Sequence, residues 1–147
     1  MTGDAEHAGQ YCTFTIDDDL YGIAVEEIQE VIVHQDMTPA PLAPPAVRGL
    51  INLRGQVVIA IDMRTRLGLP PLAEGRLPTN IVVSAAGGTV SLLVDEIGEV
   101  LDLDTGFEDP PATLRGVARQ LIRAVCRLDD RLLQILDVTA AIAVRAG

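Results

Sequence analysis

The sequence predicts an all-β fold with a few short helices. Short runs of apolar and β-branched residues alternate with polar residues along most of the chain, which is the period of half-buried strands. Clusters of glycine, proline or aspartate separate these runs and indicate tight turns. Many short strands at such spacing favour barrels or a sandwich over a parallel α/β sheet.

The first two predicted strands form a hairpin. Residues Tyr11–Ile16 alternate in the manner of a strand, Asp17–Asp19 is a turn signal, and Leu20–Val25 runs back. We expect a short helical turn at Glu26–Val31, because Ile28 and Val31 are three positions apart and acidic residues lie near the positive end of the turn.

The next stretch contains a loop, a strand and a capped helix. Four prolines within Thr38–Pro45 remove backbone donors and predict an extended loop. Gln56–Ile61 is rich in β-branched residues and apolar on both faces, so we expect a strand that is buried on both sides. Asp62 is a suitable N-cap for a short helix over Met63–Leu67, which Gly68 ends.

A second hairpin is predicted in the middle of the chain. Asn80–Ser84 and Thr89–Val94 are strand-like and flank a turn of alanine and glycine. Asp95–Leu103 then alternates acidic with apolar residues, and Asp109–Pro111 predicts another rigid loop.

The last third has arginines at every fourth position, which taken alone indicates one long helix. Asp129–Asp130 is however a turn signal, and its flanks, Leu121–Leu128 and Arg131–Val138, fit a hairpin. We therefore predict two strands, followed by a helix over Thr139–Val144 that is capped by Asp137 or by its own first residue.

Length and charge limit the classes of function. The 147 residues fit one domain, expected over residues 10–147 after a flexible segment at 1–9. A net charge of −10 disfavours nucleic acid and anionic lipid as partners. There is no apolar run of about 20 residues and no basic, apolar leader at Met1–Gln10, so we expect a cytoplasmic protein without membrane insertion.

The residue types that bind metals or perform catalysis show no constellation. Cys12 and Cys126 lie among alternating apolar residues and are expected to be buried, reduced thiols. The acidic clusters lack the ligand spacing of a calcium loop, and His7 and His34 have no recognisable nucleophile or carboxylate partner. We expect no metal, no cofactor and no enzymatic activity.

One long motif and four shorter ones resemble the CheW-like family. The long motif runs from Val47-Arg48-Gly49 through Asn52-Leu53-Arg54-Gly55 into an apolar strand that ends at Asp62-Met63-Arg64. The shorter stretches lie on both sides of the long motif, in the order that the family shows, and they extend the resemblance over about Gln10–Ala143. They are Phe14–Ile23, Glu27–Val31, Leu93–Ile97 and Leu128–Leu133.

The resemblance implies two five-stranded SH3-like barrels packed around a shared apolar core. It also implies an adaptor in signal transduction, which couples the cytoplasmic tip of chemoreceptors to the regulatory domain of a CheA-type histidine kinase and is recruited to membrane receptor arrays. The same coupling in an array that controls pili or a second messenger remains open. A β-barrel protein that binds a small ligand in the cleft between the barrels is the alternative from another class, although the implied cleft positions are mostly Ile and Val.

The resemblance assigns residues to two binding surfaces. The implied receptor contacts are Ile28, Glu30, Arg54, Ile81 and Val100, and the implied kinase contacts, on the first barrel, are Val33, Met37 and Gly49. Each assignment has a structural alternative. The apolar positions are equally compatible with core packing, Arg54 with hydrogen bonds to local carbonyls, and Gly49 and Gly55 with a turn that requires positive φ.

Two acidic positions, Glu30 and Glu108–Asp109, have no single interpretation from the sequence alone. Glu30 is either solvated at a helix edge or offered to an arginine or an amide of the partner. Glu108–Asp109 stands where relatives are expected to have a basic residue near the prolines, so a second kinase contact through this loop is in doubt.

Overall fold

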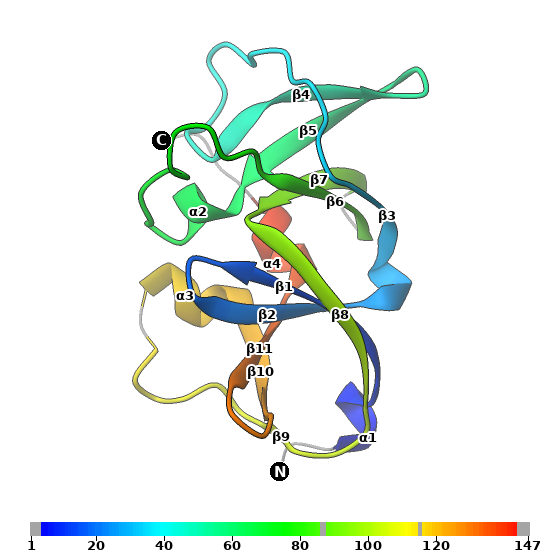
Figure 1. Cartoon of the computed structure of the whole chain (residues 1–147), viewed down its shortest axis with the longest axis vertical. Helices are drawn as coiled ribbons and strands as arrows, with labels where there is room; N and C mark the ends of the chain where they lie inside the picture. The colour runs from blue at the N-terminus through cyan, green and yellow to red at the C-terminus, as the bar shows by residue number, and fades with distance from the viewer. Residues whose placement is uncertain (1–3, 86–87, 115, 144–147) are drawn as a thin grey trace.

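The strands of the chain form two sheets, as seen in a computed structural model that describes residues 4–85, 88–114 and 116–143 (Figure 1). We call them the terminal sheet, built from both ends of the chain, and the central sheet. The terminal sheet has the order β8-β1-β2-β11-β10-β9, with bounds β1 Gly9–Ile16, β2 Asp19–Ala24, β8 Glu96–Leu103, β9 Phe107–Glu108, β10 Ile122–Arg127 and β11 Leu132–Leu136. The central sheet has the order β3-β6-β7-β5-β4, with bounds β3 Ile28–Ile32, β4 Val47–Leu53, β5 Gln56–Asp62, β6 Thr79–Ala85 and β7 Gly88–Val94.

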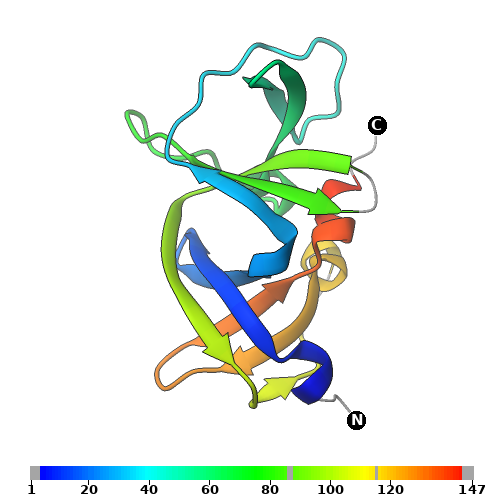
Figure 2. The same ribbon diagram turned by 90° about the vertical axis from the view of Figure 1, so that its right-hand side faces the viewer.

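Antiparallel hairpins dominate both sheets, and one parallel pairing joins two hairpins in each. In the terminal sheet β2 pairs with β11, and in the central sheet β5 pairs with β7. The pairing of β2 with β11 brings the two ends of the chain into one sheet (Figure 2). The all-β prediction is confirmed. The terminal sheet has one strand more than the expected five, because the two-residue strand β9 pairs with β10.

Short helices fill the ends of the sheets: α1 Asp4–His7, η1 Val25–Glu27, α2 Met63–Arg66, α3 Gly116–Leu121 and α4 Val138–Ile142. The predicted cap of α2 is confirmed, because the Asp62 carboxylate accepts the N–H groups of Arg64 and Thr65. Asp137 caps α4 in the same way. The predicted end of that helix, Val144, lies outside the described residues. None of the helices in the described ranges has the length and apolarity that crossing a membrane requires.

Two local predictions are wrong. The helical turn at Glu26–Val31 is only the 3₁₀ turn η1, and the chain continues as strand β3, since Ile28–Ile32 pairs with β6. β5 is not buried on both faces, because Val57 and Ile59 are 65% and 44% exposed, whereas Val58 and Ala60 are buried. This hairpin extends beyond the apolar core.

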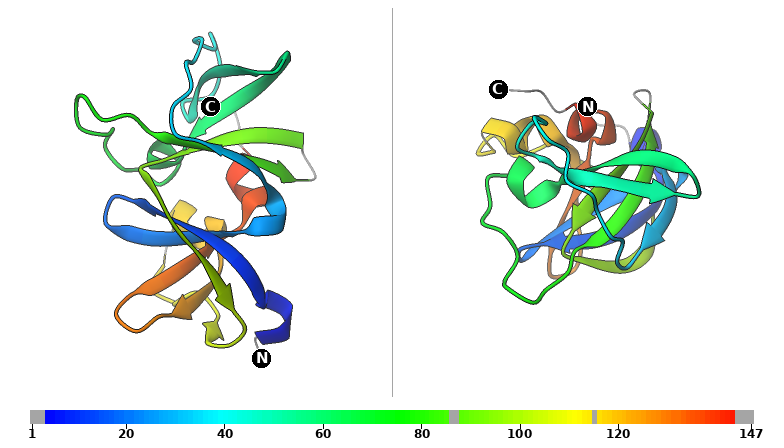
Figure 3. Two further views of the ribbon diagram at one scale, coloured as in Figure 1. Left: turned by 45° about the vertical axis from the view of Figure 1, so that its right-hand side comes forward. Right: turned by 90° about the horizontal axis from the view of Figure 1, so that it is seen from above.

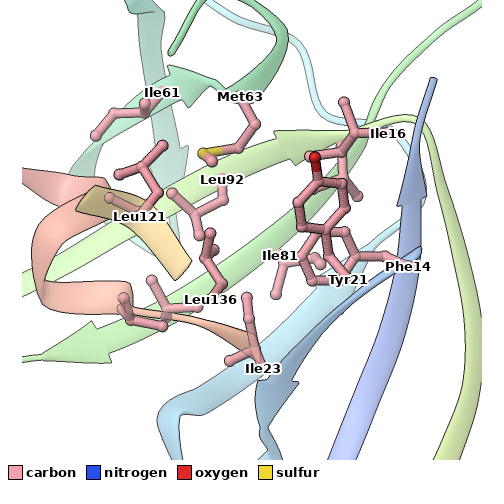
Figure 4. Packing of buried hydrophobic residues seen from close by; sticks show 14 of the residues in the cluster. Phe14, Ile16, Tyr21, Ile23, Ile61, Met63, Ile81, Leu92, Leu121 and Leu136 are labelled. Atoms are coloured by element: carbon pink, nitrogen blue, oxygen red, sulfur yellow. The ribbon is translucent and has the colours of Figure 1, made fainter. Parts of the chain in front are cut away.

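A shared apolar core lies between the two sheets (Figures 3 and 4). The terminal sheet contributes Phe14 and Ile23, the central sheet contributes Ile81 and Leu92, and α3 with β11 adds Leu121 and Leu136. The side chains point toward one another from both layers (Figure 4), and α4 covers one side of the core (Figure 3). Each sheet also encloses a smaller apolar cluster of its own, so the implied pair of barrels around a common core is confirmed.

Part of the N-terminal segment forms secondary structure and contacts the terminal sheet. Within the predicted flexible stretch 1–9, residues 4–7 form α1 and Gly9 already belongs to β1. The His7 side chain is 9% exposed, and its ring lies 5.5 Å from the ring of Phe107. The flexibility expected for residues 1–9 stays a prediction.

Candidate functional site

The hairpin of β4 and β5 ends in a tight turn that displays Arg54. Leu53 and Gln56 are paired, so Arg54 and Gly55 are the two turn residues, with φ of 50° and 89°. Two consecutive positive φ angles are typical of the turn that matches the twist of a hairpin, and glycine adopts them without strain. The Asn52 side chain accepts the N–H of Gly55 at 2.9 Å and fixes the turn.

The guanidinium of Arg54 binds the carboxylate of Glu30 through two hydrogen bonds. The Nη2–Oε2 distance is 2.6 Å and the Nη1–Oε1 distance is 3.3 Å. This hydrogen bonding raises the pKa of Arg54, because it favours the charged guanidinium. Arg54 therefore binds a residue of β3 that is 24 positions earlier in the chain, rather than local carbonyls. The side chains are 74% and 28% exposed, so the pair lies at the surface.

Two apolar positions assigned to the receptor surface are accessible. Val100 on β8 is 56% exposed and lies opposite Cys12 of β1. Ile28 begins β3, directly after η1, and is half-buried against the shared core. Because η1 and β8 both contact β1, these positions border the same strand of the terminal sheet.

The structure corrects the assignment of Ile81. Its side chain has an exposed fraction of 0% and belongs to the shared core between the sheets. A partner cannot contact this side chain while the two sheets remain packed. Ile81 is therefore a core residue, which is the alternative given for the apolar positions in the sequence analysis.

The residues assigned to the kinase differ in accessibility. Val33 follows β3 and is 75% exposed, and Met37 is half-buried against the apolar cluster inside the central sheet. Gly49 is buried in β4, where an added Cβ would lie 2.7 Å from the carbonyl oxygen of Thr38. Its φ is not positive, so the expected reason for this glycine is corrected: the backbone of Thr38 approaches too closely for a side chain.

Some surface residues were missed by the sequence reasoning. Val31, Val57 and Ile59 are exposed on the central sheet, and the uniformly apolar run Val57–Ile61 of β5 carries no sequence signal that separates its exposed residues from its buried ones. A buried ion pair between Arg64 and Asp95 was also missed, although both residues lie in motifs that the resemblance uses. A charged residue directly after an apolar strand was the available signal for Asp95.

The cysteines are free and buried, as predicted. Burial raises the pKa of the Cys12 thiol, which disfavours the reactive thiolate. Across residues 4–85, 88–114 and 116–143, no cluster of His, Cys, Asp or Glu has the geometry of a metal site.

Glu108 of the acidic stretch Glu108–Asp109, where relatives are expected to have a basic residue, forms an ion pair with Arg127 at 2.7 Å.

Comparison with known proteins places these features in a family. The model of the CheW-like domain matches residues 10–145. The chain is 28% identical over 134 residues to a chemotaxis protein CheW of Treponema pallidum, covering 88% of this chain and 79% of that one. It is 27% identical over 143 residues to a chemotaxis protein CheW of Bacillus subtilis, covering 97% and 92%. A solved structure of the scaffolding protein TtCheW from Thermoanaerobacter tengcongensis shares the fold, with a TM-score of 0.84, 24% identity and coverage of 95% and 96%.

Proposed function

Because the chain belongs to the CheW-like domain family, we propose that it is an adaptor that couples chemoreceptors to a CheA-type histidine kinase. The observation that supports this most directly is that one CheW-like domain accounts for residues 10–145, and thus for both sheets and their shared core. Its relatives of nearly equal length are named as chemotaxis proteins. The working parts of such a protein are binding surfaces.

The proposed receptor face consists of Ile28, Glu30, Arg54 and Val100. It combines accessible apolar side chains with an exposed ion pair. A helical receptor tip would place apolar side chains against Val100 and Ile28. The polar groups of Arg54 that Glu30 leaves free would hydrogen-bond to carboxylates or carbonyls of the receptor.

The proposed kinase face lies on the central sheet around Val33, Met37 and the backbone of Gly49. Val33 offers an exposed apolar contact, and Met37, four residues later in the sequence, is an adaptable side chain. Gly49 contributes through its backbone, since β4 can follow the segment around Thr38 closely only without a Cβ. This face is separate from Val100, which belongs to the terminal sheet.

The mechanism is linkage between two binding sites. The protein performs no chemistry of its own, and works in the cytoplasm at membrane receptor arrays. By holding receptor and kinase together, it allows a conformational change of the receptor to bias the kinase by the difference in free energy between the two bound states.

Binding measurements with both partners test this function. Isothermal titration with a receptor tip fragment and with the kinase regulatory domain should show binding of each, and the two together should form a ternary complex. Failure of both to bind would refute the proposal. A thermal shift of several degrees with ATP, a metal ion or a metabolite would instead favour a ligand-binding protein.

A further inference from the structure

Asp95 is the one residue between β7 of the central sheet and β8 of the terminal sheet. It is 5% exposed, and its carboxylate accepts three hydrogen bonds. Oδ1 accepts from Nε of Arg64 at 2.9 Å, and Oδ2 accepts from Nη2 of Arg64 and from the N–H of Asp17, both at 2.7 Å. The N–H of Asp95 donates to the carbonyl of Thr15 at 3.1 Å. The crossover between the sheets is thus fixed by directional polar contacts.

Arg64 connects this crossover to the central sheet. It lies in α2, directly after β5, and is 9% exposed. Its Nη1 donates to the carbonyl of Pro70 at 2.8 Å, and its Nη2 lies 3.6 Å from the Asp17 carboxylate. Asp17 belongs to the turn between β1 and β2 and has a φ of 59°. We call Arg64, Asp95 and Asp17 the crossover cluster, because they join α2, the β7–β8 crossover and the β1–β2 turn.

We propose that the crossover cluster is a positioning device that sets the angle between the two sheets and thereby the place of β8 on the receptor face. Apolar packing in the shared core is non-directional and tolerates small rotations of one sheet against the other. A two-point arginine–carboxylate pair fixes both distance and direction. Where the receptor face is concerned, the inference rests on the proposed function.

The position of Val100 shows why the angle matters. Val100 lies five residues after Asp95 on β8, whereas Arg54 and Glu30 belong to the central sheet. A change of direction at Asp95 therefore displaces one part of the receptor face relative to the other. The kinase face lies within the central sheet and would not be displaced.

The space around the ion pair allows this movement. Arg64 and Asp95 line an open pocket of about 230 Å³, together with residues of the loop that includes Leu72 and Arg76. If Asp95 lost its charge, the Arg64 side chain would have room to turn toward solvent. The crossover would then lose its fixed direction without a steric clash that unfolds the chain.

The neighbouring ion pair supplies a matched control. Arg76 lines the same pocket and binds Glu96 at 3.1 Å, one residue after Asp95. Both side chains are exposed, at 48% and 72%. Exposed pairs of this kind contribute little, so Arg76→Ala removes a charge near the crossover without removing the cluster.

A distance measurement between the sheets tests the proposal. Spin labels are placed at Gln56→Cys, at the start of β5, and at Asp129→Cys, between β10 and β11, both exposed positions. The native cysteines are 7% and 1% exposed and will not compete for the label. Pulsed electron paramagnetic resonance should give one narrow distance distribution for the parent and for Arg76→Ala, and a broader or shifted one for Asp95→Asn and Arg64→Lys.

Titration with the two partners completes the test. Asp95→Asn should weaken binding of the receptor fragment by about tenfold or more and leave binding of the kinase regulatory domain unchanged. Unchanged distances in folded Asp95→Asn and Arg64→Lys would overturn the proposal, as would equal loss of both affinities. If Asp95→Asn does not fold, Arg64→Lys alone decides, because it retains the charge but not the forked geometry. Altered distances in a protein whose parent binds no receptor fragment would support the positioning role and refute the proposed function instead.

Discussion

Arg54 and Glu30 connect the two edges of the central sheet. Glu30 lies on β3 and Arg54 in the β4–β5 turn, and β3 and β4 are the outermost strands of the order β3-β6-β7-β5-β4. The segment that follows β3 also returns to β4, where Thr38 forms a backbone bridge with Leu50. The sheet is therefore curled, and the ion pair spans its open side at the surface.

Replacing Arg54 by alanine should leave the fold intact and weaken signalling. The side chain is 74% exposed, and an exposed ion pair contributes little to stability. Circular dichroism should show an unchanged spectrum and melting temperature, while a receptor-coupled kinase assay should show reduced activation. Glu30→Ala is the matched variant and should have the same effect. An unfolded Arg54→Ala would identify a structural arginine, and unaltered coupling would refute its place on the receptor face.

Val100→Asp should reduce receptor affinity by about tenfold or more and spare kinase binding. Burial of one valine in an interface contributes about 1.5 to 3 kcal/mol, which a charged carboxylate would forfeit. Because Val100 is 56% exposed, the free protein should tolerate the change. Isothermal titration against both partners measures the two affinities. The control is Leu132→Asp on β11, a 38% exposed position outside the proposed face, which should bind normally.

Val33→Asp should have the reverse effect. The side chain is 75% exposed and lies on the proposed kinase face, so the substitution should weaken binding of the kinase regulatory domain and leave receptor binding unchanged. Titrating both variants against both partners gives four affinities. If Val33→Asp and Val100→Asp weaken the same partner, the division into two faces is incorrect.

Ile81→Ala should destabilise the fold instead of acting on one partner. The side chain is fully buried in the shared core, and truncation of a buried isoleucine to alanine costs about 2 to 5 kcal/mol. Urea denaturation should show this loss. A variant as stable as the parent would contradict the placement of Ile81 in the core.

Local pattern was sufficient for much of the fold, because turns and alternation are encoded by neighbouring residues. The hairpins at both ends and the Asp62 cap were predicted on that basis. Burial of Ile81 and exposure of Val100 were not predictable, because both are apolar strand residues and their difference depends on which sheet covers each face. β3 was mistaken for a helical turn since its pairing with β6 joins residues far apart in sequence.

The same limit applies to the functional residues. The motifs containing Arg64 and Asp95 were recognised, but their contact spans 31 positions and depends on how α2 is placed against the crossover. Likewise Arg54 was identified from its motif, but its pairing with Glu30 was not. That pairing depends on the curl of the central sheet, which brings the edge strand β3 next to the β4–β5 turn.

Acid should weaken the contribution of Asp95 to stability. Burial alone would raise the pKa of this carboxyl, but hydrogen bonds from Arg64 and from the N–H of Asp17 prevail and hold the pKa below its ordinary value of 3.8. A carboxyl whose pKa is lower in the folded state stabilises the fold fully above the unfolded value, and this stabilisation is lost as pH falls from there through the folded pKa.

Urea denaturation of the parent and of Asp95→Asn at a series of pH values measures this contribution. The difference in free energy of unfolding should be constant from about pH 5 to 7 and should shrink below about pH 4, since protonation of Asp95 makes the parent resemble the variant. Glu96→Gln, at the exposed neighbouring carboxylate, should give a small difference throughout. A difference for Asp95→Asn that stays constant through the acid range would mean that the Asp95 carboxylate is not held ionised by Arg64.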